Sequence, residues 1–546
     1  MRRVIFACLL SVFGLAASAH AQWTPPLGIP APPFGLNEVA PATPSPWTTE
    51  VPGFYYVDGT NGTDNNGTYG TPAAPRKTIP FTLPAGSVVE LHGTYDQSHS
   101  APRGFNCRGT AAQPVFVRGV DAASRPLIRR AWEASGSYCI FENLEFGAFD
   151  TSETGKITFL APLDHAVVRH SELHGNLADG GAGVDSFTPG ATSSYVVFWD
   201  NSVHDTGNYQ APQDDDAGGI GIGGLTHHIW VIDNILYRNG RDAVTLNQGS
   251  GVGHPINGIQ YVFIGRNQMY QNRQGGVATK EASDVVISQN VMWGHRPNSG
   301  GLGMGVTTLY NPERIWILFN TIYDTERGIG IPGAGSVYVI GNVLYNIHHT
   351  TATYDPADLF DAQTGEAIYF RNSLKVFIIA NTIFDVDAGI VGTGNHEVHV
   401  LNNIIAQKTE PLARHIFLAT IPSAEIRNNL IDASPVISWN DPTVYTVSSF
   451  QSKFSSMASG NLTGNPLFTN AAAHDFHIAA NSPARDKGLA SAVYATFKSL
   501  YNVDLDRDAG GGLRPLGAYD IGAFEGTGAV VNGPAEAPTG VRVSRD

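Results

Sequence analysis

Residues 261–290 read YVFIGRNQMYQNRQGGVATKEASDVVISQN, and they contain the unit that decides the fold. A few alternating apolar residues are followed by an Asn, a second short apolar run and a turn, and the unit then begins again. Asn267 and Asn290 hold the same place in two successive copies, 23 residues apart. Such self-similarity at a short period is the signature of a repeat protein whose neighbouring copies share one core.

Copies of this unit extend from about residue 167 to residue 429, and several are spaced by 22 or 23 residues, close to one turn of a parallel β-helix. We therefore predict an all-β solenoid. We expect each repeated Asn to lie at an inward bend and to bond its amide to the coils above and below, as a structural ladder rather than a catalytic row. The repeated positions are Asn201, Asn234, Asn267, Asn290, Asn320, Asn342, Asn381, Asn403 and Asn429.

The N-terminus has the pattern of a secretory signal. A pair of arginines, an apolar run (residues 4–17) and the small-x-small site AHA (residues 19–21) follow one another. Cleavage before Gln22 is expected, so residues 1–21 are predicted to be a signal peptide and the mature protein to be secreted, either extracellular or periplasmic. A retained membrane anchor is the alternative, and no later apolar stretch approaches the length of a membrane span.

Composition limits the partners of the chain. With 33 Lys and Arg against 48 Asp and Glu, the formal net charge is −15. Nucleic-acid binding draws on clustered Lys and Arg, so a nucleic-acid partner is not expected. Any polyanionic substrate must meet a local basic patch, because the overall field repels it. Cys107 and Cys139, which remain after the signal is removed, form either a disulfide or two buried thiols.

The remaining sequence divides by composition. Residues 22–52 are Pro-rich and predict an extended arm, and residues 53–430 predict one large β-helix. Residues 431–526 lose the period and are expected to close the β-helix, and residues 527–546 form a Gly/Pro linker tail. A solenoid needs caps at both ends, and because capped solenoids are commonly monomeric, we expect a monomer.

Two flanking segments and the repeat together carry a resemblance to a known family. YYVDGTNGTDNNGTYGTPAAPRKTIP (residues 55–80) resembles the first strand and cap of the right-handed parallel β-helix superfamily, which includes pectate lyases, chondroitinase B and alginate lyases. SPARDKG (482–488) and DLDRDAGGGLRPLGAYDIGAFE (504–525) resemble its C-terminal closing segment. The resemblance covers about residues 55–525 and implies a right-handed parallel β-helix with a substrate groove along one sheet. That fold also hosts hydrolases, phage spikes and adhesins.

The segment TKEASDVVISQN (279–290) resembles the Lys-bearing coil of the β-helix lyases, in which a Lys removes the C5 proton of a uronic acid. The resemblance implies that Lys280 is the catalytic base of a β-elimination. The C5 proton becomes acidic only when a cation or metal neutralises the adjacent carboxylate, and a Lys acts as base when positive charge or desolvation lowers its pKa. The alternative is that Lys280 pairs with Glu281 or Asp284 at the rim.

His295 and Arg296 open a Gly-rich loop after this coil. Arg binds carboxylates bidentately and His exchanges protons near neutral pH. We therefore predict that Arg296 neutralises the uronate carboxylate and that His295 assists as proton donor. In the resembling lyases the Arg stands on the sheet face of the next coil, whereas Arg296 falls in a loop, and a turn-capping pair is the alternative.

The other candidate residues are polar side chains that interrupt the repeat. Asp214, Asp215 and Asp216 crowd oxygen ligands together and predict a Ca²⁺ site. The same carboxylates also fit acid/base chemistry by a pair with split pKa values, or a solvated acidic loop. Predicted substrate-binding residues are Arg273, Glu281, Asp242 and Tyr310.

Together these patterns predict a secreted polysaccharide lyase that cleaves an acidic, uronic-acid-containing polysaccharide by β-elimination. Ca²⁺ is the one cofactor that the sequence suggests. A glycoside hydrolase of the same fold is an alternative, since Gln213-Asp214-Asp215 is similar to the paired-Asp motif of polygalacturonases, which place two or three carboxylates across the scissile bond. The second alternative is a solenoid without catalytic activity that binds carbohydrate or serves as a surface scaffold.

Overall fold

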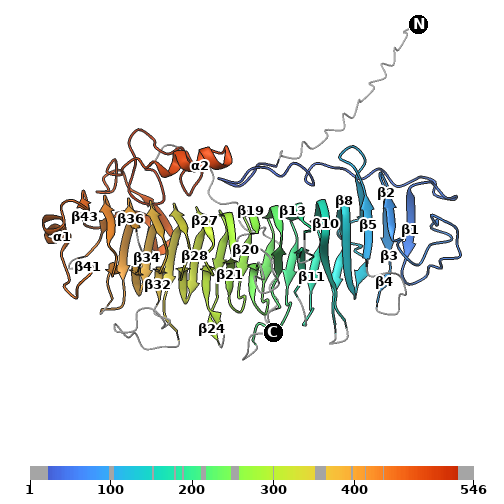
Figure 1. Ribbon diagram of the computed structural model, residues 1–546, viewed down its shortest axis with the longest axis horizontal. Helices are drawn as coiled ribbons and strands as arrows, with labels where there is room; N and C mark the ends of the chain where they lie inside the picture. Colours follow the sequence, from blue (N-terminus) through green and yellow to red (C-terminus); the bar gives the residue numbers. More distant parts are fainter. Residues whose placement is uncertain are drawn as a thin grey trace, which may run out of the picture.

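The computed structural model describes residues 23–526 apart from residues 97–103, 150–152, 178–179, 187, 189, 211–216, 248–257, 299–300, 351–364, 395–396, 412 and 434–435. The described chain winds as a long parallel β-helix in which each regular coil gives one strand to each of three ladders (Figure 1). We call these ladder 1, ladder 2 and ladder 3, in the order in which the chain passes through them within one coil. The fold is the right-handed parallel β-helix that the resemblance implies.

Ladder 1 contains β2 (Thr82–Pro84), β5 (Gly104–Arg108), the first parts of β8 (Ala131–Glu142) and β10 (Lys156–Arg169), β12 (Ala182–Ser186), β15 (Ile220–Gly224), β18 (Asp242–Asn247), β21 (Gly275–Lys280), β26 (Met304–Leu309), β29 (Arg327–Ile331), β32 (Glu366–Arg371), β35 (Ala388–Thr393), β38 (Ile416–Ala419) and β41 (Ile437–Trp439). Ladder 2 contains β1 (Phe54–Asp58), β3 (Val88–His92), β6 (Val115–Arg118), the second parts of β8 and β10, β13 (Ser193–Trp199), β16 (Thr226–Ile232), β19 (Ile259–Gly265), β22 (Ala282–Ser288), β27 (Glu313–Leu318), β30 (Ser336–Ile340), β33 (Lys375–Ile379), β36 (Glu397–Leu401), β39 (Ser423–Arg427) and β42 (Ala458–Ser459).

Ladder 3 contains β4 (Thr94–Tyr95), β7 (Leu127–Ile128), β9 (Glu145–Gly147), β11 (Glu172–His174), β14 (Ser202–His204), β17 (Ile235–Tyr237), β20 (Gln268–Tyr270), β23 (Val291–Trp293), β28 (Thr321–Thr325), β31 (Val343–Ile347), β34 (Thr382–Val386), β37 (Ile404–Lys408), β40 (Leu430–Ile431) and β43 (Leu462–Thr463). Outside the ladders are the pairs β24 (Pro297–Asn298) with β25 (Gly301–Leu302) and β44 (Phe468–Asn470) with β45 (Asp475–Ile478), and the helices α1 (Val447–Lys453), η2 (Ala471–Ala473) and α2 (Val493–Tyr501). None of these helices has the length and apolarity needed to cross a membrane.

The period-two alternation of the sequence explains which side chains enter the core. In β21, Val277 is buried in the main hydrophobic cluster, whereas Lys280, on the opposite face of the strand, is only half-buried. Valines and isoleucines of successive coils stack in the same way along the whole solenoid and form one continuous core. Because all strands are parallel and in register, the outward residues also form rows, and these rows shape the surface.

The predicted Asn ladder is confirmed. The Asn320 side-chain amide donates to the Asn342 Oδ1 at 3.0 Å and to the Ile287 carbonyl at 2.9 Å, and the Asn320 backbone N–H donates to the same Asn342 oxygen at 2.9 Å. The pattern repeats from Asn201 and ends at Asn461. The β-helix therefore continues through β42 and β43, one coil beyond the boundary at residue 430 that the sequence predicts.

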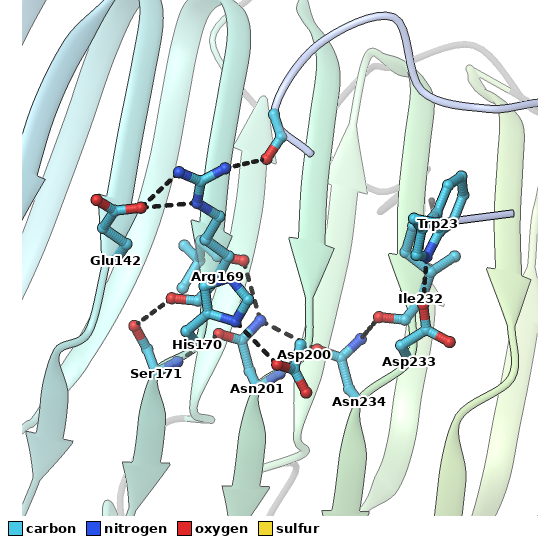
Figure 2. A network of polar contacts seen from close by, with 12 residues as sticks. Trp23, Glu142, Arg169, His170, Ser171, Asp200, Asn201, Ile232, Asp233 and Asn234 are labelled. Atoms are coloured by element: carbon cyan, nitrogen blue, oxygen red, sulfur yellow. Dashed lines mark hydrogen bonds and ion pairs between the residues drawn. The ribbon is translucent and has the colours of Figure 1, made fainter. Parts of the chain in front are cut away.

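The Pro-rich arm lies along the outside of ladder 2 (Figure 1). The Trp230 indole N–H donates to the Pro30 carbonyl at 2.8 Å. Figure 2 shows two further anchors: Trp23 donates to Asp233 at 2.8 Å, and Arg169, paired with Glu142, donates to the carbonyl of Gly35 at 2.8 Å. The arm is thus fixed by backbone carbonyls and side chains over many coils.

The closing segment folds back over ladders 2 and 3. Phe497 of α2 packs edge-on against Trp316 at 4.8 Å between ring centroids, and Tyr501 donates to Asp284 at 3.0 Å. Phe476 of β45 packs on Tyr345 of ladder 3. In the described part of the chain, the arm and the closing segment are therefore packed against ladders 2 and 3.

The two cysteines that remain after the signal form a disulfide. Cys107 in β5 is joined to Cys139 in β8, with a Cα–Cα distance of 5.9 Å. Both side chains are buried, so the bridge lies inside the first coils of the solenoid. Of the two alternatives open from sequence, the structure has the disulfide.

Candidate functional site

A groove of about 290 Å³ crosses the outer face of ladder 1 over β10, β12, β15 and β18. Its floor is formed largely by backbone, because Gly183, Gly221 and Gly223 occupy outward positions of β12 and β15. Polar side chains stand around this floor. They are Lys156, Thr158, Asp185, Arg241, Thr245 and Asn247.

Strand register places Lys280 beside this groove. The outward residues of ladder 1 form two rows, with adjacent strands about 4.8 Å apart. Asn247 of β18 pairs with Lys280 of β21, so Lys280 extends the groove by one strand. The first row is Thr158, Gly183, Gly221, Thr245, Ala278 and Thr307, and the second row is Leu160, Asp185, Gly223, Asn247, Lys280 and Leu309.

The groove is basic on an acidic protein. Lys156 and Arg241 line it, Lys280 follows on the next strand, and Asp185 is the one carboxylate among the described lining residues. Arg241 lies 4.0 Å from the buried carboxylate of Asp242, measured between Nε and Oδ2. Among the described residues, two cations and one carboxylate line the groove, and a third cation lies on the adjacent strand.

Three of the predicted site residues lie together at one edge of ladder 1. Lys280 pairs in register with Leu309, so Glu281 and Tyr310 follow them on adjacent coils. Glu281 and Tyr310 both turn the corner into ladder 2 with left-handed backbone, at φ 50° and 60°. Tyr310 is 64% exposed. Lys280, Glu281 and Tyr310 thus lie together at one edge of ladder 1, on the two strands that follow β18.

Three other predicted residues lie at the opposite edge. Asp242 and Arg273 are buried where the chain enters β18 and β21. His295 is fully buried, its Nδ1 lies 3.3 Å from the Asn272 carbonyl, and burial lowers its pKa to about 4. The strand between this edge and Lys280 is about 16 Å long. His295 therefore does not reach the proton-transfer position that the sequence predicts for it.

Arg296 is held away from the groove by an ion pair. Its Nη2 lies 2.5 Å from Asp324 Oδ1, and its Nη1 also donates to the Asp324 backbone carbonyl. Asp324 belongs to β28, so the guanidinium lies at the corner between ladders 3 and 1. The geometry does not bring Arg296 to Lys280. The two cations that line the groove are Lys156 and Arg241.

The predicted calcium ligands Asp214, Asp215 and Asp216 lie outside the described residues. They precede β15, which forms the groove floor. Within the described ranges, no three His, Cys, Asp or Glu side chains are grouped as metal ligands. Calcium binding by this loop therefore stays a prediction.

The groove residues Lys156, Asp185, Thr245 and Arg241 were not predicted from sequence. Their signal is weak, because it consists of single polar residues at outward positions of short strands. The alternation GIGIGG (219–224) was the stronger signal, since glycine at every second position of a strand leaves one face without side chains.

A second unpredicted feature is an aromatic stack on the outer face of ladder 3. Trp293 lies between Tyr270 and Tyr323, with ring centroids at 4.5 and 5.8 Å. Both faces of its indole are therefore covered and only its edge is available, so it does not offer a platform for a sugar ring. The signal in the sequence is an aromatic or His three residues after a ladder Asn or, for His174, three residues after Ser171. The members are His174, His204, Tyr237, Tyr270, Trp293, Tyr323 and Tyr345.

His204, which stacks between His174 and Tyr237, predicts a pH-dependent stability. Burial alone lowers the pKa of His204, but hydrogen bonds to Asp205 (2.7 Å) and Glu172 (3.2 Å) outweigh it and raise the pKa. The stabilisation is thus complete below the ordinary His pKa of about 6.5 and is lost as the pH rises through the raised value. We expect His204→Gln to cost about 1–2 kcal/mol near pH 6 and less near pH 9. Denaturant unfolding at both pH values tests this, and an equal cost at the two would contradict it.

No protein-family model matches the sequence, and no curated protein matches it either. Solved structures with a similar chain path include pectate lyase Pel9A, at 15% identity and TM-score 0.39 over 87% of this chain and 96% of that one. The GH136 lacto-N-biosidase from Eubacterium ramulus has 13% identity and TM-score 0.43 over 69% and 67% of the two chains. The PL6 family polysaccharide lyase Pedsa3628 from Pseudopedobacter saltans has 10% identity and TM-score 0.42 over 75% and 94%. The fold assignment rests on the three ladders themselves.

Proposed function

We propose that this protein is an exported polysaccharide lyase that binds an acidic, uronic-acid-containing polysaccharide in the groove of ladder 1 and cleaves it by β-elimination. The observation that carries the proposal is the groove itself. Its floor is bare backbone, Lys156 and Arg241 line it, and Lys280 stands on the adjacent strand. On a chain of net charge −15, this concentration of cations favours an acidic ligand. The signal segment at residues 1–21 supports export.

The elimination assigns one role to each part of the groove. Lys280 Nζ, as the neutral amine, takes the C5 proton of the uronate, the electron pair forms the C4=C5 double bond, and the C4–O bond breaks. The leaving oxygen takes a proton from water. Lys156 and Arg241 lie at the entry ends of β10 and β18, about one strand length from Lys280, so their proposed role is to pair with carboxylates of other uronates in the bound chain. The positive charge that the sequence assigns to Arg296 must therefore come from a group nearer to Lys280. Glu281 and Tyr310 at the rim are the proposed contacts to neighbouring sugars.

Ca²⁺ at Asp214, Asp215 and Asp216 is a proposed source of positive charge. These residues lead into β15, and hard carboxylate oxygens suit Ca²⁺. Bound there, the ion would supply charge neutralisation to a uronate in the groove. Loss of activity in a chelator and its return with Ca²⁺ would support this role, and full activity in the chelator would exclude it.

The experiment is an ultraviolet assay for the unsaturated uronate on pectate, alginate, chondroitin and related polyuronates. We expect a rise in absorbance with at least one of them, because elimination leaves a conjugated C4=C5 bond. New reducing ends without this absorbance would instead indicate a glycoside hydrolase. If neither assay detects a product but the protein binds the polysaccharide, the protein is a carbohydrate-binding solenoid.

A further inference from the structure

Gly221 is one of three glycines in a row of ladder 1 whose other positions carry side chains. The first outward row of ladder 1 continues beyond Thr307 to Gly330 and Tyr369. From β10 to β32, three of its positions are bare, namely Gly183, Gly221 and Gly330. Threonine occupies the equivalent position in β10, β18 and β26.

Two of these glycines have atoms close to the position of a Cβ, whereas Gly221 has none among the described residues. A Cβ at Gly330 would lie 2.5 Å from the Met304 sulfur, and one at Gly183 would lie 3.1 Å from the Gly221 carbonyl oxygen. A Cβ at Gly221 would meet no described atom within 4 Å, and its φ lies outside the left-handed range. Glycine is unfavourable inside a strand, where β-branched residues such as Thr are favoured. The fold therefore tolerates a side chain at Gly221, and the groove lies directly above it.

We infer that Gly221 is a specificity-determining residue of the groove, whose missing side chain makes room for one pyranose ring of the substrate lying flat on β15. The inference rests on the proposed function for the identity of the ligand. One face of a pyranose ring presents C–H groups that pack on flat backbone, while its hydroxyls and carboxylate point outward from the rim. Thr245 on the next strand and the cations Lys156 and Arg241 stand around this position to receive those polar groups.

Two substitutions separate this role from a structural one. Gly221→Thr installs the side chain that three equivalent positions carry, and Gly221→Trp fills the groove. We expect both proteins to fold, with the Tm of Gly221→Thr equal to or above that of the wild type. We expect Gly221→Trp to weaken binding of polyuronate oligosaccharides at least about tenfold and Gly221→Thr to weaken it less. Ala419→Trp on β38 is the control, because it adds the same bulk to the same sheet face outside the groove.

Binding is measured by calorimetry, separately from cleavage. Wild-type affinity in a folded Gly221→Trp would overturn the inference, and so would an equal loss in Ala419→Trp or a lowered Tm in Gly221→Thr. A selective loss of binding in Gly221→Trp, with no elimination by the wild type, would leave the sugar subsite standing and remove the lyase proposal. If the wild type binds no polyuronate, both proposals are wrong.

Discussion

Replacing Lys280 with Ala should lower kcat for elimination by about 10²–10⁴-fold, the range expected for loss of a general base. Lys280 is the cation on the strand next to the groove wall, paired in register with Asn247. Removing its amine leaves the groove floor and the cations Lys156 and Arg241 in place, so we expect the dissociation constant to rise less than about tenfold. The measurements are the initial rate of unsaturated-uronate formation at saturating substrate and the affinity for the same polymer.

Two variants control this prediction. Lys375→Ala removes a Lys that is paired with Glu397 at 3.1 Å on ladder 2, outside the groove, and should leave the rate unchanged. Lys280→Arg keeps the positive charge but removes an amine that can act as base, so it should bind polymer and remain inactive. A wild-type rate in either Lys280 variant would show that another group takes the proton.

The fold could be predicted because a local pattern in the sequence determines it. The spacing of Asn267 and Asn290 gives the coil length, and the alternation of apolar residues gives the inward face of each strand. The residue at which the solenoid ends was predicted less accurately. Between Asn429 and Asn461 the chain inserts α1, which breaks the period, although the Asn amides still bond across that gap.

The candidate site was predicted only where it follows from the same periodicity. Lys280 and Glu281 end a strand and Tyr310 ends the next one, so their shared edge follows from register. Arg296 lies 16 residues after Lys280, less than one coil of 22 or 23, so it falls on a different corner.

The remaining groove residues depend on contacts that sequence spacing does not carry. Lys156 begins β10 and Arg241 directly precedes β18, which lies three strands further along ladder 1, with loops of different length between them. Loop insertions change the sequence distance between stacked residues without changing their spatial register. Side chains gathered across several coils therefore became visible only in the folded chain, whereas the glycine alternation of residues 219–224 was already visible in the sequence.

Asn320→Ala should be among the most destabilising single substitutions in the chain. The Asn320 side chain is fully buried, donates to Asn342 and Ile287, and accepts from the backbone N–H and side-chain amide of Asn290. Its removal leaves donors and acceptors on both neighbouring coils buried without partners. At about 1–3 kcal/mol for each unsatisfied group, we expect a loss of roughly 3–6 kcal/mol in the free energy of unfolding.

The end of the ladder provides the matched control. Asn461 accepts hydrogen bonds from Asn429 and donates to the Ile426 carbonyl, but it is the last member, and the part-buried Gln451 side chain stands where the next Asn would be. Asn461→Ala should therefore cost less, because the last coil can open locally without unfolding its neighbours. Denaturant unfolding followed by circular dichroism gives both values. If Asn320→Ala and Asn461→Ala lower the free energy of unfolding equally, each amide acts as an independent contact within its own coil. A larger loss at Asn320 would show that the ladder couples the coil carrying Lys280 to the rest of the solenoid.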